Sequence, residues 1–233
     1  MKASRLFTTA IFSIIGVLAA AQPWMMRPQG PANEFSAMEG TSVLNYNLQM
    51  ERDIHSRAGY GPAFYIFPDS KLDNNQALEL AGKLDLVNII KEYGGRIMVV
   101  NPSSDKWQEQ DLENFRRLIG MGGAPTNVKV IGIGSGATFV NRHLAATDLT
   151  GVIAGIVSID GEPGKICKLP VPAFIGGKNA TKTAKPYQST SDAAPADPLQ
   201  KVVVNTDKKA SLETLFAEAW DKVLSENYRY NNL

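Results

Sequence analysis

Apolar residues gather along the chain in short continuous runs that indicate strands buried on both faces. The runs are rich in β-branched side chains and are bounded by Gly, Pro, Asn or Asp, as is typical of strands in a parallel sheet. Residues 42–50 alternate partly between apolar and polar, which predicts a half-exposed edge strand. The expected buried strands are residues 63–67, 96–101, 128–131, 152–159, 171–175 and 201–204.

Segments with apolar residues at helical spacing separate several of these strands. Residues 75–93 predict a helix that begins after Asp73 or Asn74 and ends at Gly94-Gly95. Further helices are expected over residues 110–119 and from Ser211 to Leu224. Strands that alternate with helices predict an α/β fold of three layers, in which helices cover both faces of a mostly parallel sheet.

Two segments lack both periodicities. Residues 22–42 are rich in Pro, Gly, Met and Asn, and residues 178–199 are rich in Lys, Ala, Thr, Ser, Asp and Pro. Such composition predicts an irregular leader and a long surface loop. The leader and the edge strand together occupy residues 22–58, and residues 59–233 form a single α/β domain.

The strand at 128–131 runs directly into the alternating glycines Gly132, Gly134 and Gly136, and a helical pattern follows. A sharp turn from strand to helix leaves little room for Cβ atoms, which explains the glycines. Two chemistries use such a turn: the nucleophile elbow Gly-x-Ser-x-Gly and the dinucleotide fingerprint. The second is matched by Gly132-x-Gly134-x-x-Ala137, and Asp160 ends the next strand, where a ribose-binding carboxylate is expected.

The first 21 residues have the pattern of a signal peptide. Lys2 and Arg5 precede an uncharged run from Leu6 to Ala21, which ends in Ala19-Ala20-Ala21 before Gln22. We therefore expect a secreted or periplasmic protein, with no membrane span in the mature chain. Asn179-Ala180-Thr181 is a glycosylation sequon in such a chain.

Charge and cysteine usage exclude several kinds of partner. Without Lys2 and Arg5, the 24 basic residues fall to 22 against 23 acidic ones, so no nucleic acid partner is predicted. Cys167 is the only cysteine; it cannot form an intramolecular disulfide, and we interpret it as a buried inert thiol. With His55 and His143 as the only histidines, no metal site and no cofactor are predicted.

The chain resembles the secreted α/β-hydrolases of the polyhydroxybutyrate depolymerase and feruloyl esterase type. The resemblance covers roughly residues 60–225 as a pattern of elements. It is carried by residues 64–68, by Lys106-Trp107 before an acidic helix, by residues 130–139 and by residues 171–177. It implies an α/β-hydrolase-like fold and an ester-bearing or polymeric ligand, with Asp69, Ser70 and Trp107 near the oxyanion site or the cleft.

The same resemblance implies a serine on the elbow, an acid near the next strands and a histidine after the last strand. If Gly132 and Gly136 flank the nucleophile, its position is Gly134, which has no side chain; the other register selects Ser135. Lys178-Asn179 holds the usual acid position, and Asp160 is a substitute. Residues 205–207 contain no histidine, so none is assigned.

These departures lead to three hypotheses. The first is a catalytically degenerate hydrolase-like domain that binds a ligand or supports a partner chain or domain. The second is an active serine carboxylester hydrolase that uses Ser135, with Asp160 and His55 or His143. The third is a dinucleotide-binding protein.

Overall fold

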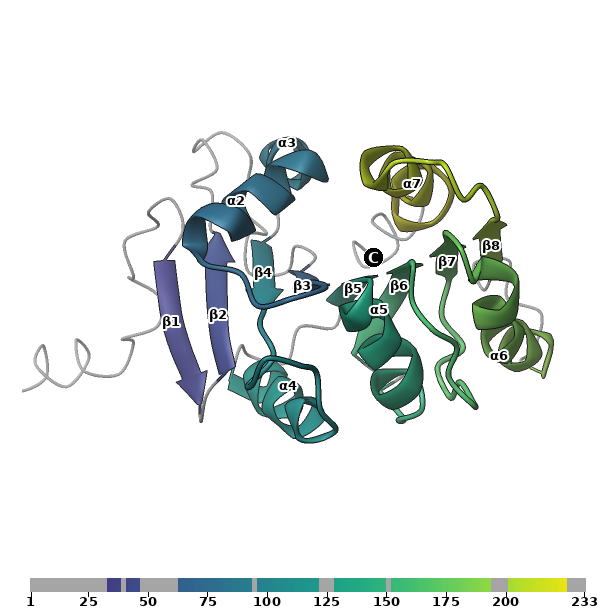
Figure 1. Cartoon of the computed structure of the whole chain (residues 1–233), viewed down its shortest axis with the longest axis horizontal. Coiled ribbons are helices and arrows are strands. Elements are labelled where there is room, and N and C mark those ends of the chain that lie inside the picture. The colour runs from purple at the N-terminus through teal and green to yellow at the C-terminus, as the bar shows by residue number, and fades with distance from the viewer. Residues whose placement is uncertain are drawn as a thin grey trace, which may run out of the picture. The chain divides into compact units, whose positions relative to one another are not determined.

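An eight-stranded sheet forms the centre of the computed structural model, with the strand order β1-β2-β4-β3-β5-β6-β7-β8 (Figure 1). Strand β2 runs antiparallel to β1 and β4, whereas all neighbouring strands from β4 to β8 are parallel. The strands are β1 (Asn33–Met38), β2 (Thr41–Tyr46), β3 (Ala63–Phe67), β4 (Arg96–Val100), β5 (Val128–Ile133), β6 (Ile153–Ile159), β7 (Ala173–Gly176) and β8 (Val202–Asn205).

The structure describes residues 33–38, 41–46, 63–93, 96–121, 128–149, 152–193 and 201–225. The predicted signal peptide and His55 lie outside these residues. In the described ranges, no helix is long and apolar enough to cross a membrane.

Helices cover both faces of the sheet, which confirms the predicted three-layer α/β fold (Figure 1). Leu112, Phe139 and Tyr187 belong to one buried cluster, and Ile90 and Phe216 to the other. The first face carries α4 (Gln110–Met121), α5 (Ser135–Phe139), the π-helix η1 (Val140–Leu144) and α6 (Ala180–Ala193). The second carries α2 (Asn74–Lys83), α3 (Leu86–Tyr93), α7 (Leu212–Ala219) and the π-helix η2 (Trp220–Leu224).

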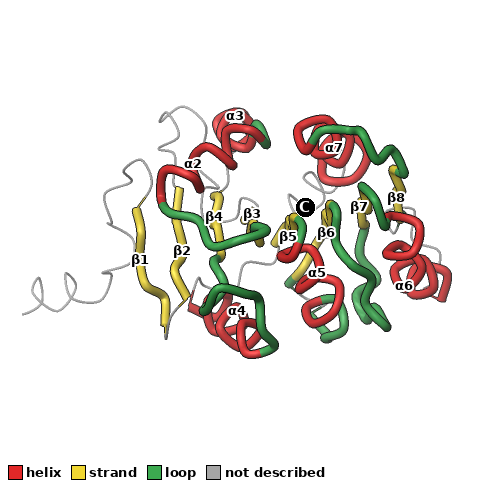
Figure 2. The backbone as a smooth tube through the Cα atoms, viewed as in Figure 1, coloured by secondary structure: helices red, strands yellow, loops and turns green. Residues whose placement is uncertain are grey.

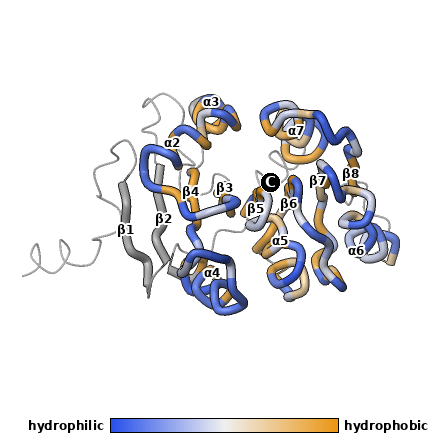
Figure 3. Tube along the Cα trace, in the orientation of Figure 1, coloured by the Kyte–Doolittle hydropathy of each residue, from blue (hydrophilic) through white to orange (hydrophobic). Residues whose placement is uncertain are grey.

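The predicted buried strands and helix caps agree closely with the structure. The side chain of Asp73 accepts a hydrogen bond from the Gln76 N–H in a capping box, and Ser211 caps α7. The central strands β3 and β5 are almost entirely buried because helices cover them on both sides. Figure 3 shows these strands as largely hydrophobic, whereas the outer turns of α4 and α6 are hydrophilic.

Three predictions about secondary structure were wrong. Strand β1 lies within the segment expected to be an irregular leader, and it leaves β2 as an inner strand rather than an edge strand. The helix predicted over 75–93 is two helices, because Asp85 adopts a left-handed conformation with φ 53°. The segment 178–199 contains α6, in which Ala180, Thr183, Ala184 and Tyr187 are buried at helical spacing despite Pro186.

Candidate functional site

The turn between β5 and α5 has the geometry of a sharp strand-to-helix elbow. Its tip is Gly134, with φ 57° and ψ −118°, a conformation that side-chain-bearing residues adopt only under strain. A Cβ atom on Gly132 would lie 2.6 Å from Cα of Ala137, and one on Gly136 would lie 2.5 Å from the carbonyl carbon of Phe67. Gly132 and Gly136 are therefore the close-packed flanking positions, and Gly134 is the position between them.

The carboxylate of Asp69, in the loop after β3, covers this tip. Asp69 Oδ1 accepts a 2.6 Å hydrogen bond from the Ser135 N–H, and Ser135 Oγ donates to the main-chain oxygen of Asp69. A Cβ atom on Gly134 would lie 2.6 Å from Asp69 Cγ. The N–H that follows the elbow tip, which forms part of the oxyanion hole in α/β-hydrolases, is thus already bonded to an anion of the same chain.

An aromatic stack supports the loop that carries Asp69. The indole N–H of Trp107 donates to the Pro68 carbonyl at 2.9 Å. Its ring stacks on Phe139 with centroids 4.8 Å apart, and it contacts Phe67 at 5.3 Å. Trp107 therefore packs against the elbow helix and fixes the β3–α2 loop, drawn in green in Figure 2. It does not line the cavity described below.

Asp160 follows β6 and points toward the loop after β7. Its φ is 56°, and its Oδ1 accepts a 3.0 Å hydrogen bond from the Lys178 N–H. A Cβ atom on Gly177 would lie 2.8 Å from Asp160 Cγ. Beside it, the Asn179 side chain donates to Glu162 Oε1 at 2.9 Å. These contacts hold the β6 and β7 loops together, and none of them joins Asp160 to Ser135 or to His143.

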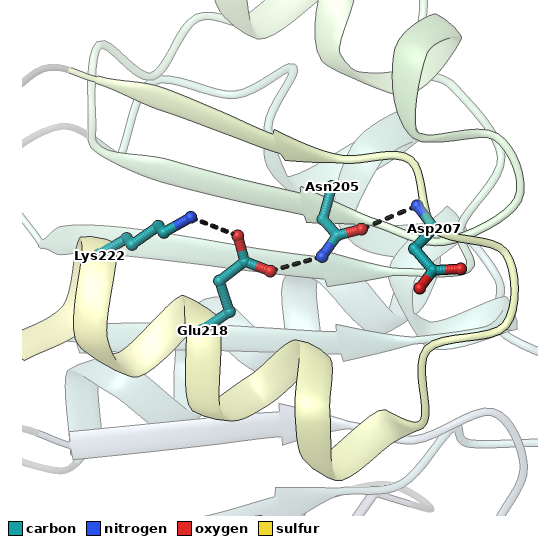
Figure 4. Close-up of polar contacts among 4 residues, drawn as sticks. All are labelled: Asn205, Asp207, Glu218 and Lys222. Carbon is teal, nitrogen blue, oxygen red and sulfur yellow. Dashed lines mark hydrogen bonds and ion pairs between the residues drawn. The ribbon is translucent and has the colours of Figure 1, made fainter.

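A network of polar side chains occupies the end of β8, where the resemblance predicts a histidine (Figure 4). Asn205 donates through its side-chain amide to Glu218, and its Oδ1 accepts from the Asp207 N–H at 2.8 Å. Lys222 Nζ bonds the other oxygen of Glu218 at 2.6 Å. The hydrogen bond from Lys222 and, to a smaller extent, the hydrogen bond from Asn205 lower the pKa of Glu218. The network ties β8 to α7.

His143 lies in η1, four residues after Phe139 of the elbow helix. Its ring stacks on Phe139, with centroids 5.5 Å apart and an interplanar angle of 30°. Between Ser135 and His143, both within the described residues, there is no hydrogen bond. Among the described residues, no hydrogen bond joins Ser135, Asp160 and His143, the members of the triad considered above that the structure describes.

A cavity of about 260 Å³ opens beside the elbow, between the β3–α2 loop, α2 and the start of α7. The predicted cleft residues Asp69 and Ser70 line it. Sequence reasoning did not select the polar residues that α2 contributes, since the exposed face of an amphipathic helix carries such residues in any case. The other lining residues are Pro68, Leu72, Gln76, Glu79, Leu80, Lys83, Ile133 and Leu212.

Two further observations concern candidate chemistry elsewhere. Cys167 is buried, and burial raises the pKa of its thiol, which keeps it protonated. Over the residues that the structure describes, no group of three or more His, Cys, Asp or Glu side chains is placed to hold a metal ion.

Comparison with known proteins gives the fold. No protein-family model and no curated protein sequence matches the chain. Solved structures do: MGS-M1, an α/β hydrolase from a Medee basin deep-sea metagenome library, has a TM-score of 0.60 at 12% identity over 88% of this chain and 99% of that one. The chain has the α/β-hydrolase fold.

Two further solved structures show the same similarity. Est1E from Butyrivibrio proteoclasticus gives a TM-score of 0.53 at 12% identity, over 85% of this chain and 99% of that one. Esterase 2 from Thermogutta terrifontis gives a TM-score of 0.52 at 12% identity, over 86% of this chain and 96% of that one. At such low identities, the structural similarity establishes a shared fold. The chemistry of this chain follows only from its own site residues.

Proposed function

We propose that this chain is an exported α/β-hydrolase-fold domain that binds a ligand beside the elbow without hydrolysing it. The observation that carries the proposal is the tip of the elbow: Gly134 provides no nucleophile, and Asp69 Oδ1 occupies the adjacent N–H of Ser135. Catalysis of acyl transfer depends on N–H donors aimed at the developing oxyanion. A carboxylate at that position both uses a donor and repels the charge.

Within the described residues, no side chain is placed to act as a general base for Ser135. Its hydroxyl donates to a main-chain oxygen rather than to an imidazole, and a serine with no general base is only a weakly reactive alcohol. Removal of Ser or His alone from a serine triad costs on the order of a million-fold in turnover. The polar network of Asn205 and Glu218 at the end of β8 supports the same conclusion.

The dinucleotide hypothesis has less support. Pyrophosphate binding requires free N–H groups at the start of the helix that follows the glycines. Here the Ser135 N–H is bonded to Asp69, whose negative charge would repel a phosphate. The carboxylate of Asp160, which would bind the ribose, accepts a hydrogen bond from the Lys178 N–H instead. An ester-bearing or polymeric ligand, which the fold resemblance suggests, stays a prediction.

The direct test is hydrolysis of p-nitrophenyl butyrate by the purified chain, compared with Ser135→Ala. We expect no turnover above that of the heat-denatured chain, and the same result for both proteins. Turnover that Ser135→Ala abolishes would establish the rival function, an active serine esterase, and refute ours. Turnover that persists in Ser135→Ala would show that another nucleophile acts, which would also refute it.

A further inference from the structure

The cavity beside the elbow has three charged side chains in its lining, and two of them neutralise each other. Lys83 Nζ lies 2.7 Å from Glu79 Oε1 in an i,i+4 pair on α2. The hydrogen bond and the charge of Glu79 raise the pKa of Lys83, so the lysine keeps its positive charge beside Glu79. The remaining charge is the carboxylate of Asp69, and the lining therefore carries a net charge of about −1.

The two oxygens of Asp69 have different roles. Oδ1 is held by the Ser135 N–H, which fixes the carboxylate over Gly134. Among the described residues, no protein group bonds Oδ2. The donor that would otherwise favour a carbonyl or carboxylate at the elbow is consumed, and Asp69, which lines the cavity, contributes a negatively charged hydrogen-bond acceptor.

The rest of the lining is largely apolar. Leu72, Leu80, Ile133 and Leu212, together with the ring of Pro68, form the walls. The cavity, at about 260 Å³, lies just below the roughly 300 Å³ at which pockets for drug-sized ligands begin. A complementary ligand is therefore small, with an apolar body and one polar end.

We propose that this cavity selects a small organic cation, a primary ammonium on a short aliphatic body, whose charged end is recognised by Asp69. The inference rests on the proposed binding function and specifies its ligand class. Charge complementarity carries it: an ammonium donates to an ionised acceptor, whereas a carboxylate of the same size is repelled. The apolar walls take the alkyl chain.

The test is isothermal titration calorimetry of the purified chain with n-hexylammonium, 1-hexanol and hexanoate, each in a separate titration. Asp69→Asn is the decisive variant, because the amide oxygen still accepts from the Ser135 N–H while the charge is lost. Asp192→Asn, an exposed aspartate on α6 away from the cavity, is the matched control.

We expect n-hexylammonium to bind at least tenfold more tightly than hexanoate. Asp69→Asn should weaken n-hexylammonium roughly tenfold, as expected for loss of a hydrogen bond to a charged group. Asp192→Asn should leave the affinity for n-hexylammonium unchanged, and Asp69→Asn should leave the affinity for 1-hexanol unchanged.

The outcomes separate the two proposals. If 1-hexanol or hexanoate binds as well as n-hexylammonium, or if Asp69→Asn and Asp192→Asn behave alike, the preference for a cation is refuted while ligand binding stands. If none of the three probes gives saturable binding, the inference of a site for a small aliphatic cation is refuted, whereas the proposed function is refuted by turnover of p-nitrophenyl butyrate.

Discussion

Lys129 is a fully buried lysine in the middle of the sheet, and its replacement by methionine should stabilise the protein. Its side chain lies in β5 between Phe64 and Gly155 of the neighbouring strands. A Cβ atom on Gly155 would lie 3.5 Å from Lys129 Cδ and 3.3 Å from a methyl carbon of Leu224, so the glycine leaves room for the lysine stem. Within the described part of the chain, Lys129 Nζ has no hydrogen-bond partner.

Burial lowers the pKa of Lys129 from 10.5 to about 7. This difference corresponds to about 4–5 kcal/mol, as an upper figure, because water entry or a small rearrangement reduces it. The unfolded chain binds more protons than the folded one between pH 7 and 10.5, so the free energy of unfolding rises with pH across that window. The destabilisation is complete at pH 7 and below, and it vanishes above pH 10.5.

Lys129→Met keeps an unbranched apolar stem and removes the amine. We expect it to raise the free energy of unfolding by about 2–4 kcal/mol at pH 6, and by progressively less as the pH approaches 10. Urea denaturation followed by circular dichroism at pH 6, 8 and 9.5 measures this difference. Lys182→Met, on the exposed face of α6, is the control and should change stability by about 0.5 kcal/mol or less.

The reasoning about Lys129 would be refuted if methionine gave the same stability difference at every pH, since the effect would then come from packing alone. It would equally be refuted if methionine destabilised the protein at pH 6. In that case the amine would have a partner that outweighs its loss of hydration.

Two further substitutions test the contacts around the elbow and behind it. Gly134→Ala should lower the free energy of unfolding by about 1–3 kcal/mol, because the new Cβ atom meets the Asp69 carboxylate at a positive φ. In the Asp69→Gly background the loss should be smaller. A double-mutant cycle measured by urea denaturation checks this, and additive effects of the two substitutions would contradict it. Tyr187→Phe removes the 2.9 Å hydrogen bond from the phenol to buried Asn141 Oδ1. It should cost about 1–3 kcal/mol in the same assay, and an unchanged midpoint would show that water replaces the phenol.

The candidate site could be located from the sequence, but its contents could not. The spacing of Gly132, Gly134 and Gly136 predicts a sharp turn because only glycine tolerates the close approach of backbone there. The contact of Asp69 with Ser135, in contrast, joins residues 66 positions apart. It depends on the order of β3 and β5 in the sheet, and no local pattern specifies it.

Lys129 illustrates the same limit in the core. In the sequence it interrupts an apolar run that predicts a buried strand, and no local pattern indicates where its amine lies. It is buried because helices cover both faces of the central strands, and because Gly155 of the adjacent strand leaves space for its stem. Register between strands distant in sequence decides both facts.

Local chemistry alone determined the buried strands, the caps at Asp73 and Ser211, and the elbow, because each follows from periodicity or from the conformational preference of a few neighbouring residues. Tertiary structure decided the rest: that α6 forms where composition suggests a loop, that Asp69 covers Gly134, and that Lys129 is buried. These outcomes depend on which apolar faces meet across the sheet and on the space between them, and a linear pattern of residues contains neither.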